Sequence, residues 1–229
     1  MATGWKEIAK AIEERLDTEL VPAVYATLSV PTEQIQRELE QGGQLGDRPT
    51  PADRDQAADV LIAGAARTAT ALGAVGGLGG AAALAPEILG QLIGSLRLAQ
   101  RLAVVYGFDP HSENGAQLLW RAMAAAHGVD MPAAGRMDVS LGELKQVLGK
   151  GPTEPSYAAT WMLQQILRRT TRTIARRTSR WIPGVGMGVS ALAARKRMAG
   201  QGARMKAVYQ GAFEGDPDPG EDIEEAWVV

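Results

Sequence analysis

The sequence contains no cysteine and only two histidines, His111 and His127. Disulfide bonds, thiolate metal sites and a cysteine nucleophile are therefore excluded. HExxH, GxSxG, P-loop and Rossmann fingerprints are also lacking, because the GGLGG run at 76–80 has neither the lysine nor the preceding strand of a phosphate-binding loop. No residue can be nominated for catalysis, so the sequence favours a non-enzymatic function with no metal and no cofactor. We interpret both histidines as structural, with His127 placed as an imidazolium at a helix C-terminus.

Aromatic residues make up only 5% of a chain that is 45% hydrophobic. Such a chain can bury a sizeable core, but alanine and glycine must supply much of it. Helices with small side chains can approach each other closely, and several glycine pairs have the small-xxx-small spacing that permits this. These pairs are Gly73 with Gly77, Gly76 with Gly80, Gly90 with Gly94, and Gly184 with Gly188.

Acidic residues are absent between positions 155 and 213, although the net charge of the chain is only -2. This basic half contrasts with residues 1–59, where acids outnumber bases by about two to one, and with residues 214–229, which form a purely acidic tail. The positive charges of this segment repel one another unless an anion neutralises them. The candidates are phospholipid, nucleic acid and the acidic ends of the protein itself.

Runs of alternating apolar and polar residues are absent, and helical spacing separated by Pro and Gly recurs throughout. We predict an all-α fold: a single compact multi-helix domain with a glycine-rich apolar core and a disordered acidic tail. Three regions are expected: N-terminal acidic amphipathic helices over 1–50, a helical domain over 51–213 and the tail over 214–229. Predicted helix boundaries are an end or bend at Pro22, a start near Pro31, a stop at Gly42 and Gly43, a cap at Thr50 with Pro51 and Asp53, ends at Gly107 and Gly128, and a last helix from Val185 to about Tyr209.

Residues 69–85 carry no charge, which is roughly the length at which a membrane span begins to be plausible. The run is mostly Ala, Gly and Thr, which partition weakly into lipid. We expect a helix, a break and a second helix packed within the protein, and keep entry into a bilayer as the alternative. After Pro86, a broad apolar face predicts a buried helix: Ile88, Leu89, Leu92, Ile93, Leu96, Ala99, Leu102, Ala103 and Tyr106.

The basic half is predicted to contain one long helix over 156–182 with an arginine stripe along one side. Arg168, Arg172, Arg176 and Arg180 recur every fourth residue, with Arg169 and Arg177 beside them. Arg195, Lys196 and Arg197 follow on the last helix. Three interpretations are open: a solvated face neutralised by the acidic segments, a surface for anionic lipid headgroups, and a nucleic-acid surface. The last is disfavoured because stacking aromatics are scarce.

Two motifs resemble the EcsC protein family. An apolar helix ends in Tyr106, Gly107, Phe108 and Asp109, and a later Pro/Gly segment with Pro183, Gly184, Gly186 and Gly188 leads to Ala207 and Tyr209. The resemblance covers roughly residues 57–209 and implies a bacterial, mainly helical protein, associated with membranes in some members and without an established activity. In family terms we expect the Tyr106 to Asp109 motif to lie against the Pro183 to Gly188 turn.

These observations favour a membrane-peripheral accessory protein that binds anionic lipid or a membrane-bound partner through its basic residues. The N-terminus lacks the pattern of a secretory signal, so we expect a cytoplasmic protein, at the inner face of the cell membrane if it meets lipid. The alternative is a soluble interaction module whose acidic tail docks on a protein partner. A carrier of an apolar ligand between the helices is a third hypothesis.

Overall fold

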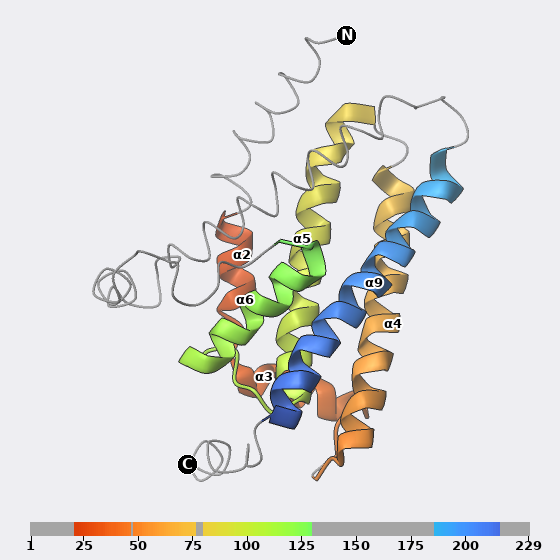
Figure 1. Ribbon diagram of the computed structural model, residues 1–229. Helices are drawn as coiled ribbons and strands as arrows, with labels where there is room; N and C mark the ends of the chain where they lie inside the picture. Colours follow the sequence, from red (N-terminus) through yellow and green to blue (C-terminus); the bar gives the residue numbers. More distant parts are fainter. Residues whose placement is uncertain (1–20, 47, 77–79, 130–185, 216–229) are drawn as a thin grey trace.

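The computed structural model describes residues 21–46, 48–76, 80–129 and 186–215 (Figure 1). Within these ranges the chain forms six packed helices and no strand, which confirms the all-α prediction. The helices are α2 (Val21–Leu28), α3 (Thr32–Gln41), α4 (Pro51–Gly76), α5 (Gly80–Val105), α6 (Glu113–His127) and α9 (Gly186–Gly215). The predictions for the first helix, the arginine stripe and the acidic tail beyond Gly215 lie outside the described residues.

Several helix ends are where local sequence predicts them. Thr50 and Asp53 form a reciprocal cap at the start of α4: the Thr50 N–H donates to Asp53 Oδ2 over 2.9 Å, and the Asp53 N–H donates to Thr50 Oγ1 over 3.3 Å. Gly107 and Gly128 follow α5 and α6 with φ of 84° and 64°, a left-handed conformation that glycine adopts without a Cβ penalty. These ends depend on neighbouring residues alone, which is why the sequence predicts them.

One helix end differs from the prediction, and two prolines lie within helices. Pro22 lies in the first turn of α2, which begins at Val21, and α5 begins at Gly80 and runs through Pro86. Proline holds φ at a helical value, so a helix can continue past it with the loss of one hydrogen bond. The last helix extends beyond Tyr209 to Gly215, because Phe213 packs its final turn against Tyr106.

Helix α5 is central and packs against each of the other five helices (Figure 1). From Leu98 to Tyr106 every residue except Arg101 is buried, so this part of the helix has almost no solvent-facing side. On one side the amide of Gln100 donates to the Thr27 carbonyl of α2 over 3.1 Å, which satisfies a buried polar group. The exposed Arg101 reaches Glu38 of α3 at 2.7 Å.

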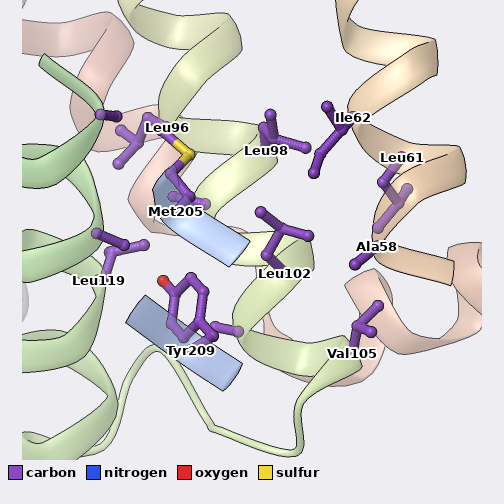
Figure 2. Close-up of a cluster of buried hydrophobic side chains, with 14 of the residues drawn as sticks. Ala58, Leu61, Ile62, Leu96, Leu98, Leu102, Val105, Leu119, Met205 and Tyr209 are labelled. Carbon is purple, nitrogen blue, oxygen red and sulfur yellow. The ribbon is translucent and has the colours of Figure 1, made fainter. Parts of the chain in front are cut away.

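Helices α4 and α9 pack closely and side by side (Figure 1). A Cβ added to Gly202 of α9 would lie 2.7 Å from Cγ1 of Ile62, so the glycine is what lets the helices approach. The expectation of a core built on close helix contact is met here, at a glycine outside the predicted pairs. Larger side chains fill the space between α5, α6 and α9, where Figure 2 places Leu102, Leu119, Met205 and Tyr209 in one buried cluster.

On either side of the glycine run at 77–79, α4 and α5 are helical, as the helix, break and helix interpretation predicts. No helix in the part of the chain that the structure describes combines the length and the apolar character needed to cross a bilayer.

Candidate functional site

The Tyr-Gly-Phe-Asp segment at the end of α5, residues 106–109, lies beside a group of charged side chains from α4 and α9. The Tyr106 hydroxyl donates to Asp55 Oδ1 of α4 over 2.6 Å. Lys206 of α9 donates to the Asp55 backbone carbonyl over 3.2 Å and to Asp59 Oδ1 over 2.8 Å. Gln210, one turn later, has its amide nitrogen 3.5 Å from Asp55 Oδ2. We call these five residues the Tyr106 cluster; it joins three helices that are far apart in sequence.

Aromatic rings cover the inner side of the Tyr106 cluster. The ring of Tyr106 stacks on that of Tyr209 with 6.4 Å between centroids and 12° between planes. Phe108 lies 6.2 Å from Tyr209, and Phe213 lies 6.2 Å from Tyr106. Two residues of the α5 motif therefore contact the C-terminal part of α9, where ring pairs of this geometry add stability beyond their buried area.

Arg54 of α4 contacts two residues next to Tyr106, namely Val105 and Phe213. Its guanidinium donates to the Val105 carbonyl over 2.5 Å, which satisfies one of the free carbonyls at the end of α5. The same group lies over the Phe213 ring, 5.3 Å from the centroid, in a cation–π arrangement. Burial lowers the pKa of Arg54, and its Nε is buried without a hydrogen-bond partner among the described residues.

The hydrogen bonds of the Tyr106 cluster have a structural role, because they join α4, the end of α5 and α9. Burial, followed by the hydrogen bond to Asp55 and the negative charges around it, raises the pKa of Tyr106, so the phenol stays neutral and acts as a donor. A tyrosine that serves as a base or nucleophile needs the opposite shift. The arrangement therefore holds α4, α5 and α9 together and does not activate a catalytic group at Tyr106.

Asp109, the last residue of the α5 motif, organises the turn between α5 and α6. One oxygen of its carboxylate accepts from the Thr32 hydroxyl over 2.5 Å and from the His111 N–H over 2.9 Å. The His111 ring nitrogen Nε2 lies 2.8 Å from the Val30 carbonyl. The motif thus ties the segment between α2 and α3 to the α5–α6 turn, which gives His111 the structural role that the sequence predicts.

His127 occupies a different environment from the one predicted. Burial, followed by the charges of Arg204 and Arg197, lowers its pKa to about 4, so the side chain is neutral near pH 7. Its Nδ1 lies 3.3 Å from the Gln201 amide nitrogen, and the Gln201 oxygen accepts from Ser95 over 3.4 Å. The prediction of an imidazolium at the helix C-terminus is wrong. Arg204 of α9 supplies the cation there, donating to the Ala126 carbonyl over 2.6 Å.

The predicted anion-binding residues fall into two groups. Arg168, Arg169, Arg172, Arg176, Arg177 and Arg180 lie outside the described residues. On α9, Arg195 and Lys196 are exposed, whereas Arg197 is half-buried and donates to the Gln91 side chain over 3.0 Å. Arg197 is thus a packing residue, and Arg195 and Lys196 are those available to a partner.

Of the residues in the two sequence motifs, the structure brings Tyr106, Phe108 and Tyr209 together. Gly186 and Gly188 begin the same helix that carries Tyr209, about 30–35 Å before it along the helix axis at 1.5 Å per residue. The α5 motif therefore meets the end of α9 rather than its beginning. Pro183 and Gly184 of the expected contact lie outside the described residues.

Sequence reasoning missed Asp55, Arg54, Gln210 and Phe213. Asp55 and Asp59 lie one turn apart on α4, and their partners lie 51 and 147 or more positions away. The only available signals were a lysine in an acid-free segment and a tyrosine at the end of an apolar helix. Neither signal names a partner, so these contacts could not be predicted.

Among the described residues, no group of three or more His, Asp or Glu side chains could hold a metal ion. No curated protein and no solved structure gave a match to the chain. The model of the EcsC protein family matches residues 2–211, which include the N-terminal helices as well as both motifs and stop before the acidic tail. Since this match spans nearly the whole sequence, the chain belongs to the EcsC protein family.

Proposed function

We propose that this protein is a non-enzymatic, membrane-peripheral member of its family that binds anionic lipid through its basic half. The observation that carries the proposal is the separation of charge along the bundle. The acids of α4, Asp53, Asp55 and Asp59, lie in its first turns, and the Lys206 contacts place Asp55 and Asp59 beside the later part of α9. Helix α9 has no acid before Glu214.

The cations of α9 differ in their surroundings: some bond to other groups of the protein, and others are exposed and distant from the acids of α4. Lys206 is paired with Asp59, and Arg204 and Arg197 are bonded to a carbonyl and an amide oxygen. Arg195 and Lys196 are exposed and lie farther toward the start of the helix, away from the acids of α4. The basic segment before α9 adds further arginines with no acid among them. Anionic headgroups would supply the counter-charge, at about 1 kcal/mol per cation near the surface.

Co-sedimentation with vesicles tests the proposal. The full chain should pellet with vesicles that contain phosphatidylglycerol and stay in solution with pure phosphatidylcholine. The bound fraction should fall as salt rises from 0.05 to 0.5 M, since the Debye length shortens to well below about 10 Å over that range. Equal and negligible pelleting with both vesicle types would show the proposal to be wrong.

A truncated chain separates this proposal from docking through the acidic tail. Removing residues 216–229 leaves α9 complete and takes away only negative charge and the terminal AWVV segment. If lipid binding depends on the basic half, the truncated chain should bind anionic vesicles at least as well as the full chain. Loss of vesicle binding on truncation would place the contact in the tail instead.

A further inference from the structure

Helix α9 carries an exposed apolar side chain next to its exposed cations. Leu192 is 66% exposed, and among the described residues only one other large hydrophobic side chain, Val60, counts as exposed. Arg195 and Lys196 follow Leu192 by three and four positions, so all three side chains share one face of the helix. Nothing in the described part of the chain covers this face.

The rest of this face is nearly flat. Going toward the end of α9, the next exposed positions on this face are Ala203 and Ala207, whose side chains are methyl groups. The adjacent helix α4 runs antiparallel to α9, as shown by Lys206 against Asp59 and Gly202 against Ile62. By the same register, the exposed Arg67 comes to the level of Met198, about half a turn from Lys196. A further cation is thus added at this end of the bundle.

We propose that the face formed by Leu192, Arg195 and Lys196 is where the protein meets an anionic bilayer, with Leu192 inserted between the headgroups and the two cations at the phosphates. This inference rests on the proposed function and names the surface that performs it. A leucine flanked by cations has the arrangement of an interfacial amphipathic helix, in which the apolar residue enters the acyl boundary and the basic stems extend toward the headgroups.

The composition of the face distinguishes this occupant from a nucleic acid. Phosphate backbones are satisfied by cations alone, and single strands gain most from aromatic side chains on which bases stack. This face has no aromatic residue, and an exposed leucine would add nothing to a phosphate contact. A bilayer uses both parts of the face, since its surface is charged and its interior takes up the leucine.

Two variants of the full chain test the inference in the vesicle assay described above. Arg195→Glu with Lys196→Glu should weaken binding to phosphatidylglycerol vesicles at least about 25-fold, because each lost cation costs about fivefold and each added acid repels the surface. Leu192→Ser should weaken binding by several-fold to about tenfold without changing the net charge. All three side chains are exposed, so the thermal midpoints of the variants should match that of the wild type.

The matched control is Arg48→Glu with Arg121→Glu, which changes the net charge by the same amount at exposed positions elsewhere. Its effect should be small compared with that of the α9 pair. If both charge-reversed pairs lose binding equally, the inference about this face is overturned while lipid binding by the protein stands. If the wild type itself does not bind, the proposed function fails first.

The serine variant decides whether the leucine inserts. If Leu192→Ser binds vesicles as tightly as the wild type, while the charge-reversed α9 pair loses binding to vesicles and to a single-stranded oligonucleotide alike, the face is an electrostatic surface for polyanions. That result overturns the bilayer contact. Retained oligonucleotide binding by Leu192→Ser together with weakened vesicle binding supports it.

Discussion

Tyr106 and Tyr209 are stacked neighbours with opposite polar environments. Both rings are buried, at 1% and 0% exposure. The Tyr106 hydroxyl donates to a carboxylate, whereas the Tyr209 hydroxyl is buried with no hydrogen-bond partner among the described residues. A buried hydroxyl without a partner has lost its water and gained nothing in exchange. The same phenol group is therefore expected to stabilise the fold at one position and to destabilise it slightly at the other.

Replacing each tyrosine with phenylalanine measures this difference. Tyr106→Phe removes the donor to Asp55 and should lower the free energy of unfolding by about 1–2 kcal/mol. Tyr209→Phe should leave it unchanged or raise it by up to about 1 kcal/mol, because the ring stays and only an unsatisfied hydroxyl is lost. Urea unfolding curves of the two variants give both values, and each variant serves as the other's control. Equal destabilisation by the two changes would contradict the assignment of the hydrogen bond.

At the scale of the element, the α5–α6 turn is compact because α6 begins directly against it. Ser112 caps α6 by accepting the Gly115 N–H over 3.0 Å, and its hydroxyl donates to the Asp109 carbonyl over 2.8 Å. A Cβ at position 115 would lie 1.8 Å from the Asp109 carbonyl oxygen. Only glycine lets α6 start at this distance from the family motif.

Gly115→Ala should therefore disrupt the turn. The added methyl cannot fit without moving the backbone at Asp109, and we expect a loss of about 3 kcal/mol or more in the free energy of unfolding. Gly64→Ala in α4 is the matched control, since a Cβ there meets no atom within 4 Å. That change should raise stability by about 0.5–1 kcal/mol through helix propensity. Thermal or urea unfolding of both variants checks the pair, and a stable Gly115→Ala protein would refute the packing argument.

At the scale of the whole molecule, the sequence predicts the features that depend on neighbouring residues and does not predict contacts between residues far apart in the chain. The fold class, the cap of α4 at Thr50 and Asp53 and the ends at Gly107 and Gly128 follow from periodicity and neighbouring residues. The contact between Gly202 and Ile62 does not follow, because it depends on the register of two helices separated by most of the chain. The predicted glycine pairs had the right spacing, but spacing alone does not say which glycine meets a partner.

The same distinction applies to the candidate site, where the sequence singled out some of the residues and missed others. Tyr106, Phe108 and Tyr209 were singled out by their motifs, and the structure brings them together. Asp55 and Phe213 were not, because a charge on a helix face and a ring beyond an expected helix end have simpler explanations. The segregation of charge is visible in the sequence. Its arrangement along the bundle, with the acids of α4 beside Lys206, requires the packing of α4 against α9.

The neutral His127 makes the stability of the whole fold depend on pH. Its pKa is lowered from 6.5 to about 4 in the folded protein, so between these values the unfolded chain takes up a proton that the folded chain does not. The free energy of unfolding should fall as pH decreases from about 6.5 toward 4 and level off below 4. Between pH 7 and pH 4.5 the contribution of this one group is about 2 kcal/mol.

Carboxylates also titrate in the acidic range, so the histidine contribution must be taken as a difference between variants. His127→Gln removes the titration, and urea unfolding at pH 7 and pH 4.5 should show a smaller loss of stability for this variant than for the wild type. If His127→Gln and the wild type lose the same free energy over this range, His127 is not held neutral by its burial between α6 and α9.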